Sequence, residues 1–445
     1  MSLSDPLYLA FLGAVFFLYY LFAPGMPRRV LLLAASYFFY FELSRFCILV
    51  LWLVTLVTYL GALGLRPREE EGRRFRFFVL VATVALIPLL VFKYLGALLG
   101  LGGEAIPLVH SMQAGLSSLT MPIGISFFTF AALGYLIDVY LEVAEPEQDF
   151  GRVALFLAFF PVITAGPIER AGSFMSQFGL TAKFSSARAL SGLRLIFIGL
   201  MLKLLFAEVL QKPADSVFIA PGNCLPIEQL FGLIFYVFYL YADFAGYTLI
   251  AIGSANLFGL DVRPNFHQPF LSATVADFWR NWHISLSSWV RDYIFAPLRT
   301  HWRRYPKLGM AAALGLAFLI IGAWHGAKWG YLIFGAMHGL LVIGSTFTLA
   351  GRDAFWKTAG IPAQLIQASR MILTFILVAL TFVAFRANCV RDAMVMYQGI
   401  FSLELVREFA SGAEHLFFHR DEPLHFISEF RLRDWGRILV LIFGD

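Results

Sequence analysis

Long apolar segments separated by short polar breaks cover most of this chain. Segments of about 20 residues are long enough for a helix to cross the hydrocarbon core of a bilayer. They have no period-2 alternation, so they predict helices rather than a barrel. We therefore expect an all-α polytopic membrane protein with about ten or eleven transmembrane helices. Some segments are short or broken by Pro or Gly and are expected to re-enter. The apolar segments lie near 7–22, 30–41, 46–65, 77–99, 121–141, 153–164, 190–210, 230–257, 314–343 and 371–385.

Composition excludes a soluble protein. Of the 445 residues, 59% are hydrophobic and only 14% are charged, whereas soluble domains are about a quarter charged. The longest polar stretches, at 66–76, 142–152 and 407–437, are too short or too scattered to hold a core. We therefore expect one integral membrane domain over 1–445, in contact with membrane lipid. The first segment lacks a basic leader and a cleavage site, so we interpret it as a retained helix.

The net charge of +5 would suit nucleic acid, but the basic residues lie at segment ends, as membrane topology requires. Nucleic acid is therefore excluded as a partner. The basic groups after the first and third segments fall on one face of an up-and-down path, which places that face in the cytoplasm and the N-terminus outside. A third group at 291–307 is expected on the same face. The first two groups are Arg28 and Arg29, then Arg66, Arg68, Arg73, Arg74 and Arg76.

His338, in the block GAMHG, is the most informative residue of the apolar segments. A titratable side chain is costly at membrane depth unless it faces protein or water, so it marks a candidate functional site. Tyr331, Gly335 and His338 share one face of a helix. The notch at Gly335 can admit a substrate chain or let a neighbouring helix approach closely. Trp324 and His325 lie near the start of this segment, where His325 is expected to have a supporting role.

A second histidine, His283, lies in DFWRNWHISLSSWVRDY at 277–293. Aromatic and aliphatic residues recur there at helical spacing, with Arg280, His283 and Ser287 on another face. The pattern predicts one amphipathic helix, and its tryptophans suit a membrane–water interface. An ordinary interfacial helix whose histidine reaches toward water is an open alternative.

A buried imidazole stays neutral at pH 7 because desolvation disfavours its charged form. It can then act as a base in acyl transfer, taking the proton of an alcohol that attacks a thioester and passing it to the leaving thiolate. Donors for the oxyanion are available from Asn281, tryptophan N–H groups or His283. The chain has no GxSxG motif and no Cys/His nucleophile arrangement, which favours direct attack. Cys47, Cys224 and Cys389 have no metal spacing, and we expect no metal site.

Several blocks resemble the membrane-bound O-acyltransferase (MBOAT) family, in its bacterial branch of polysaccharide O-acetylases and D-alanyl transferases. They occur in family order, and the similarity covers about 121–386, leaving 387–445 as an amphipathic tail. The blocks are MPIGISFFTFAALGYLIDVY at 121–140, FFPVITAGPIER at 159–170, YADFAGYTLIAIG at 241–253, NFHQPF at 265–270 and the two histidine segments.

The resemblance implies a helical membrane fold with a funnel or tunnel in the bacterial cytoplasmic membrane. There an acyl group, such as acetyl, passes from a cytoplasmic thioester, acetyl-coenzyme A or an acyl carrier protein, to a hydroxyl of an extracytoplasmic polysaccharide or relay protein. It implies no bound cofactor and an extracytoplasmic acyl-handling partner protein. His338 would be the essential catalytic residue and His283 the second. Candidates for the substrate site or tunnel are Asp277, Trp279, Arg280, Asn281, Trp282, Ser287, Trp324, His325, Tyr331 and Gly335.

The branch within the family stays open. The blocks ISFFTFAALGYLIDVY and AGPIER look more like the alginate-type O-acetylases. Leu249, in YADFAGYTLIAIG, stands where the alginate type usually has an aspartate, which favours D-alanyl transfer from a carrier protein to a cell-wall polymer. The sequence APLRTHWRRYPKL at 296–308 replaces a Gly-Gly-Asn-Arg turn of the alginate type. Only a short apolar run at 438–443 follows Trp435, so a final span of the family is expected to be missing or truncated.

Two other classes of protein are alternatives. A transporter would also use intramembrane histidines, as a proton relay, but Asp138 and Asp243 are the main carboxylates of the apolar segments. A scaffold for a polymer-export complex would lose no polymer modification on His338→Ala.

Overall fold

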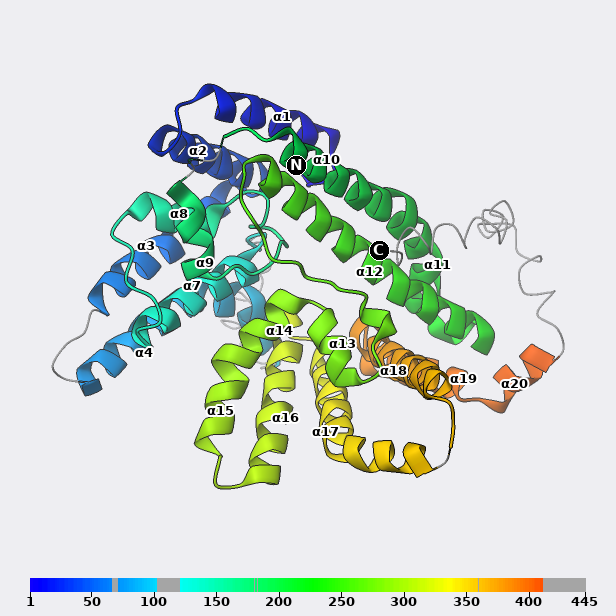
Figure 1. The fold of residues 1–445 in the computed structure, drawn as a ribbon. Helices are drawn as coiled ribbons and strands as arrows, with labels where there is room; N and C mark the ends of the chain where they lie inside the picture. The colour runs from blue at the N-terminus through cyan, green and yellow to red at the C-terminus, as the bar shows by residue number, and fades with distance from the viewer. Residues whose placement is uncertain (66–70, 102–120, 180, 182, 359, 411–445) are drawn as a thin grey trace.

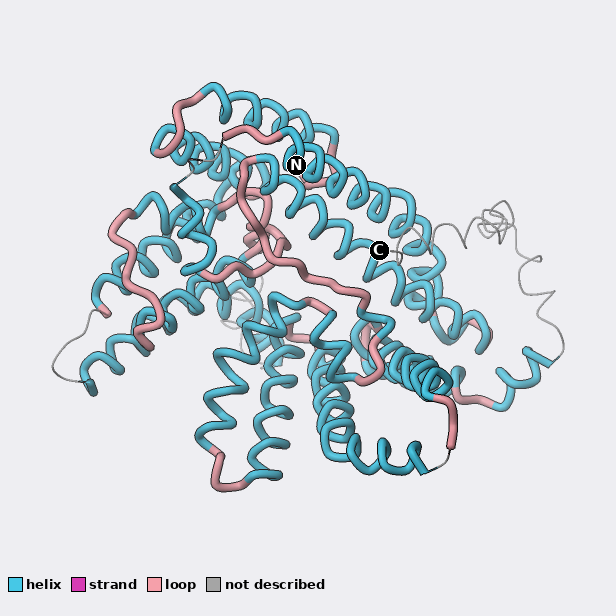
Figure 2. The backbone as a smooth tube through the Cα atoms, viewed as in Figure 1, coloured by secondary structure: helices cyan, strands magenta, loops and turns pink. Residues whose placement is uncertain are grey.

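The computed structural model describes the chain except residues 66–70, 102–120, 180, 182, 359 and 411–445. Regular structure in the described residues is helical, without strands, as expected (Figure 2). The tail histidines His415, His419 and His425, which are expected in a charged surface segment rather than a metal site, lie outside the described part. Trp435 and the run at 438–443 lie outside it too.

Within the described ranges, the helices are joined by loops and by π-helical or 3₁₀ turns. In chain order they are α1 (Pro6–Leu21), α2 (Met26–Leu43), α3 (Ile48–Gly64), α4 (Glu71–Leu90), α5 (Gly96–Leu101), α7 (Ile125–Tyr140), α8 (Phe150–Ala158), α9 (Ala171–Met175), α10 (Ser186–Leu200), α11 (Glu208–Ile219), α12 (Pro226–Leu257), α13 (Val275–Asn281), α14 (Ile284–Val290), α15 (Ala296–His301), α16 (Pro306–His325), α17 (Trp329–Thr358), α18 (Ala363–Arg386), α19 (Val390–Ile400) and α20 (Leu403–Ala410).

Among the described residues, 5 helices are long and apolar enough to cross a membrane, and three shorter apolar helices accompany them. The expected count of about ten or eleven spans is therefore not confirmed. The expected span at 153–164 is wrong, because α8 has only 9 residues and the chain turns after Ala158. Such a helix rises about 14 Å, less than half of the hydrocarbon thickness. The polar side chain of Asp149 caps its start by accepting from the Gly151 N–H.

Most of the long helices belong to three groups around a central pair of short helices. Helices α10, α11 and α12 pack side by side, and α16 and α17 form an antiparallel pair that is joined by α18 (Figure 1). Helices α3, α4 and α7 pack together at the other side. The short helices α13 and α14 lie between α12 and the α16–α17 pair, where one side of each is buried and Arg280 of α13 is exposed.

Gly335 lets α16 and α17 approach closely. A Cβ at Gly335 would lie against the Phe318 carbonyl oxygen and 3.2 Å from Cα of Gly322. The notch at Gly335 is thus filled by the backbone of α16, which is the helix-packing alternative that the sequence left open.

Ion pairs bring the basic groups to one face. Arg29 of α2 pairs with Asp149 at 2.8 Å, and Arg74 of α4 pairs with Glu142 at 2.6 Å. Both carboxylates belong to the short connection between α7 and α8, so the starts of α2 and α4 lie at the same face, as predicted. The Tyr293 hydroxyl, in the π-helical turn Arg291–Phe295 that begins the third basic group, donates to Asp138 of α7 at 2.8 Å. That places the third group near the same end of α7.

Glu169 is a buried carboxylate in the connection between α8 and α9, outside the spanning helices. Its side chain is 5% exposed and accepts the Arg263 backbone N–H at 2.8 Å. Burial raises the pKa of Glu169 from 4.5 to about 7, against the opposing effect of Arg263. The folded protein therefore holds this proton at a pH where the unfolded chain has released it.

We expect Gly335→Ala to lower the thermal unfolding midpoint of the detergent-solubilised protein. The added methyl group meets the α16 backbone, and overpacking of this kind costs about 1–3 kcal/mol. Gly344→Ala, on the same helix, is the control, because nothing lies within 4 Å of its Cβ position. It should leave the midpoint unchanged or raise it. Equal midpoints for the two variants would contradict close packing at Gly335.

We expect Glu169→Gln to weaken the loss of stability as the pH rises from 4.5 to 7. A carboxyl group whose folded pKa is raised stabilises the protein when protonated, and this contribution disappears as the pH passes its folded pKa. The difference between the two proteins should grow by about 1 kcal/mol per pH unit in that window. Denaturant unfolding in detergent at several pH values measures it. Parallel stability curves would show that Glu169 is ionised at pH 4.5 in the folded protein.

Candidate functional site

His338 lies on α17 with no exposed surface. Aromatic rings surround its imidazole on several sides. Phe334, one turn earlier on the same helix, packs edge-on at 4.5 Å between ring centroids, and Phe278 of α13 stacks at 6.2 Å. Phe318 of α16 closes another side at 6.3 Å. The imidazole is therefore held in a dry apolar shell, where a neutral ring is favoured.

Both ring nitrogens of His338 have partners from other helices. The indole Nε1 of Trp279, on α13, donates to Nδ1 at 3.1 Å. The hydroxyl of Thr381, on α18, lies 2.8 Å from Nε2 and also donates to the Val378 carbonyl at 2.6 Å. Three helices thus converge on one imidazole. Thr381 was not among the predicted residues, although a hydroxyl within the apolar segment 371–385 was a usable signal.

His283 interrupts a helix instead of lying on one. The expected single amphipathic helix over 277–293 is wrong, because α13 ends at Asn281 and α14 begins at Ile284. Between them His283 adopts φ 44° and ψ 52°, a left-handed conformation that is uncommon outside glycine. The side chain is only 3% exposed, so the alternative of a histidine reaching toward interfacial water is also wrong.

The break is held by the loop that carries NFHQPF. The buried Asn265 accepts the Ile284 N–H with its backbone carbonyl at 2.9 Å and the Ser285 hydroxyl with its side chain at 2.6 Å. The Asn281 carbonyl accepts the His267 N–H at 3.0 Å. These hydrogen bonds replace those that a continuous helix would make. Helical periodicity therefore wrongly predicted one unbroken helix over 277–293.

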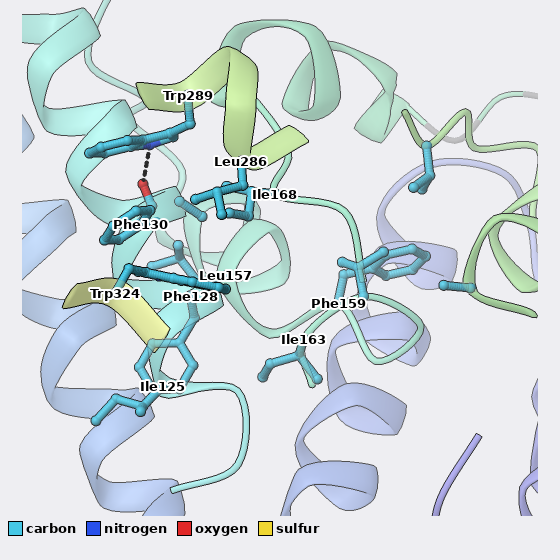
Figure 3. Packing of buried hydrophobic residues seen from close by; sticks show 14 of the residues in the cluster. Ile125, Phe128, Phe130, Leu157, Phe159, Ile163, Ile168, Leu286, Trp289 and Trp324 are labelled. Atoms are coloured by element: carbon cyan, nitrogen blue, oxygen red, sulfur yellow. Dashed lines mark hydrogen bonds between the residues drawn. The ribbon is translucent and has the colours of Figure 1, made fainter. Parts of the chain in front are cut away.

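The imidazole of His283 is buried with unpaired nitrogens. Among the described residues, neither of its ring nitrogens has a hydrogen-bond partner, and the indole N–H of the neighbouring Trp324 has none either. The rings lie edge to face, 5.7 Å apart, with Phe244 against the other side of His283 at 4.8 Å. Figure 3 shows Trp324 packed among Phe128 and Phe130 of α7. Because unpaired buried polar groups are costly, such groups in a native fold call for a functional explanation.

The side chain of Lys93, which was not among the predicted site residues, contacts the end of α16. The ammonium of Lys93 donates to the Trp324 carbonyl and to the Ser126 hydroxyl. It also lies 5.1 Å from the centre of the Trp324 ring. Lys93 belongs to a candidate spanning helix, so a charge within an apolar segment was the signal that could have identified it.

His325 is the last residue of α16 and is half-buried. Its ring lies 5.9 Å from that of Tyr331 and 4.8 Å from that of Phe385, between centroids.

The other predicted site residues of this segment either lie at the surface or pack within the fold. Arg280 pairs with Asp277 at 2.6 Å on the exposed side of α13. The Asn281 amide donates to Ser272 at 3.3 Å and so secures the loop. The Trp282 ring is buried against Phe266 and Phe382.

A cavity of about 250 Å³ adjoins this region between α13, α14, α16 and α17. Three predicted site residues line it, namely Trp279, Arg280 and Ser287. Its other walls are mainly apolar, with Arg291 at its edge, as in many pockets for ligands with an apolar portion. Neither His283 nor His338 is in the lining. Trp279 therefore lines the cavity and also donates its indole N–H to His338.

Taken together, the site offers a buried imidazole, unpaired buried donors and an adjoining apolar cavity. Within the described part of the chain, no group of three or more His, Cys, Asp or Glu residues could hold a metal ion. The groups present are suited to proton transfer and to donation of hydrogen bonds toward a carbonyl oxygen.

Comparison with known proteins identifies the family. The sequence profile of the membrane-bound O-acyltransferase family matches residues 32–386. The chain is 33% identical to the probable alginate O-acetylase of Pseudomonas aeruginosa over 399 residues, which are 88% of this chain and 73% of the relative. It is 29% identical to the peptidoglycan O-acetyltransferase of Helicobacter pylori, over 88% and 77% of the two chains. It is also 29% identical to the teichoic acid D-alanyltransferase of Bacillus subtilis, over 66% and 73%. The chain belongs to the membrane-bound O-acyltransferase family and is an acyltransferase.

Proposed function

We propose that this protein transfers an acetyl group from a thioester to a hydroxyl of an extracytoplasmic polysaccharide or of a relay protein, with His338 as the general base. One observation carries the proposal: in a chain of this family, the imidazole of His338 is wholly buried and is held by side chains from two other helices. A titratable group kept at membrane depth by such contacts has a functional role by default.

The reaction needs no covalent enzyme intermediate. The acceptor oxygen attacks the thioester carbonyl carbon while its proton passes to a ring nitrogen of His338. The carbon–sulfur bond then breaks as the tetrahedral intermediate collapses, and the imidazolium returns the proton to the leaving thiolate. The products are the ester and a free thiol. The neutral imidazole is restored, so the enzyme needs no further reactant.

His283 and Trp324 are suited to stabilise the oxyanion of the intermediate. Both are buried, and their N–H groups have no hydrogen-bond partner in the part of the chain that the structure describes. A donor aimed at the developing negative charge in a dry site contributes strongly to catalysis. The ammonium of Lys93, next to Trp324, adds positive charge at the same place.

The basic face supports a proposed membrane orientation. Arg29 and Arg74 lie at one face of the protein, and by the positive-inside rule we propose that this face is cytoplasmic and the N-terminus outside. The donor, acetyl-coenzyme A or an acyl carrier protein, would enter from this side. The acceptor, or an acyl-handling partner protein that carries the group onward, would approach from the opposite side.

We propose acetyl as the acyl group because the O-acetyltransferases match a larger share of this chain than the D-alanyltransferase does. The alginate and peptidoglycan O-acetyltransferases match 88% of this chain, whereas the D-alanyltransferase of Bacillus subtilis matches 66%. D-alanyl transfer from a carrier protein to a cell-wall polymer is the second candidate, which Leu249 favours. A transporter is less well supported, because Asp243 is paired with Lys203 and Asp138 accepts from Tyr293.

We expect His338→Ala to lower acceptor-dependent release of thiol from acetyl-coenzyme A by at least about 100-fold, the usual contribution of a general base. The assay uses purified protein in lipid nanodiscs with an oligosaccharide acceptor, and mass spectrometry of the product identifies the new ester. His301→Ala is the control, because His301 is exposed on α15. It should retain wild-type turnover. Turnover by His338→Ala near the wild-type rate would remove the assignment of the base.

A further inference from the structure

The hydrogen bonds of His338 fix its tautomer. An indole N–H can only donate, so Nδ1 of His338, 3.1 Å from Trp279 Nε1, must carry the lone pair. A neutral imidazole has one N–H and one lone pair, so the proton is on Nε2. That N–H donates to the Thr381 hydroxyl, whose own proton is donated to the Val378 carbonyl. In this series of hydrogen bonds, each donor has one acceptor.

The opposite tautomer is incompatible with this arrangement. It would place the N–H of Nδ1 against the N–H of Trp279, two donors at hydrogen-bond distance with no acceptor between them. While Trp279 keeps its position, Nδ1 is therefore the one basic nitrogen of His338. That nitrogen is already engaged, and an engaged lone pair cannot take a proton from an alcohol.

Trp279 also separates His338 from the cavity. The indole lines the cavity of about 250 Å³, and His338 does not. The indole packs against Phe318, which also lines the cavity, at 5.2 Å and against Phe334 at 6.4 Å between ring centroids. Trp279 and Phe318 therefore both contact the cavity and His338, and of these two only Trp279 binds a ring nitrogen.

We propose that Nδ1 is the basic nitrogen of His338 and that Trp279 is a positioning residue that caps it until the acceptor hydroxyl, arriving from the cavity side, takes its place. Thr381 holds the imidazole in the required tautomer through Nε2, as the third member of a catalytic triad does. The inference rests on the proposed function, in which His338 is the base.

The cap has a chemical consequence. A free basic nitrogen beside a bound thioester would activate water as readily as an alcohol, and the acyl group would be lost by hydrolysis. The Trp279 N–H, by donating to Nδ1, suppresses this side reaction until an acceptor hydroxyl competes for the nitrogen. Trp279 would therefore control the ratio of transfer to hydrolysis.

The tautomer can be measured without substrate. In protein labelled with ¹⁵N-histidine in lipid nanodiscs, the two His338 signals are assigned by their loss in His338→Gln. We expect a pyridine-type Nδ1 and a protonated Nε2 in the wild type. In Trp279→Phe, which keeps a ring but removes the donor, the Nδ1 signal should move toward that of a nitrogen without a hydrogen bond. Trp289→Phe is the matched control, because the Trp289 indole donates to the Phe130 carbonyl instead (Figure 3). A protonated Nδ1 in the wild type would overturn the proposal, even if Trp279→Phe does not fold.

Kinetics test the role of the cap. Trp279→Phe should raise acceptor-independent thiol release about fivefold relative to acceptor-dependent transfer, the change expected for one neutral hydrogen bond. Thr381→Val should lower transfer about tenfold, because it leaves the buried Nε2–H without an acceptor, whereas Thr381→Ser keeps the hydroxyl and should restore it. An unchanged ratio of hydrolysis to transfer in a folded Trp279→Phe protein would exclude the cap.

The two proposals fail in different ways. Full transfer activity in His338→Ala would remove the proposed base, whatever its tautomer. The wild-type spectrum, recorded without turnover, decides on the arrangement around Nδ1 whether or not His338 proves essential.

Discussion

Inside a bilayer a polar group without a partner costs several kcal/mol, and this constraint governs how the chain is arranged around its two buried histidines. The break in the amphipathic segment is possible because Asn265 supplies the hydrogen bonds that the lost helical turn would have made. His338 can lie between apolar helices because Trp279 and Thr381 pair both of its nitrogens. His283 and Trp324 are the contrast, since the described residues supply no partner for their buried side-chain nitrogens. Unpaired groups at this depth are what a site for a carbonyl oxygen requires.

The same loop links the fold to the chemistry. By holding the break at His283, Asn265 allows α13 and α14 to take separate directions between α12 and the α16–α17 pair (Figure 1). The direction of α13 brings the Trp279 indole to His338, and α14 supplies part of the cavity wall. The close approach of α16 and α17 at Gly335 completes the enclosure, because it brings Phe318 against the imidazole. Packing far from the reacting atoms thus sets their geometry.

The polar contacts of the cavity suit a ligand with both apolar and charged parts. Its walls are mostly aliphatic and aromatic, while Arg280 and Arg291 lie at its edge. Arg280 is tied to Asp277, and Arg291 to Asp292, so neither guanidinium is free to collapse into the apolar interior. Trp279 contacts both this space and His338. In the proposed reaction, this space would admit the thioester or the alcohol and exclude water.

The sequence by itself determined the class of fold, the family and the two histidines, because apolar runs and short motifs are local properties that survive without knowledge of contacts. It could not determine the break at His283, since helical periodicity at 277–293 is satisfied by a continuous helix and only Asn265, from a distant loop, makes the break stable. It did not identify Thr381 or Lys93, whose partners are far away in the chain. The notch at Gly335 allowed two uses, and the position of α16 decided between them. Tertiary structure decided these points because each depends on which distant group satisfies a buried polar atom or fills a gap.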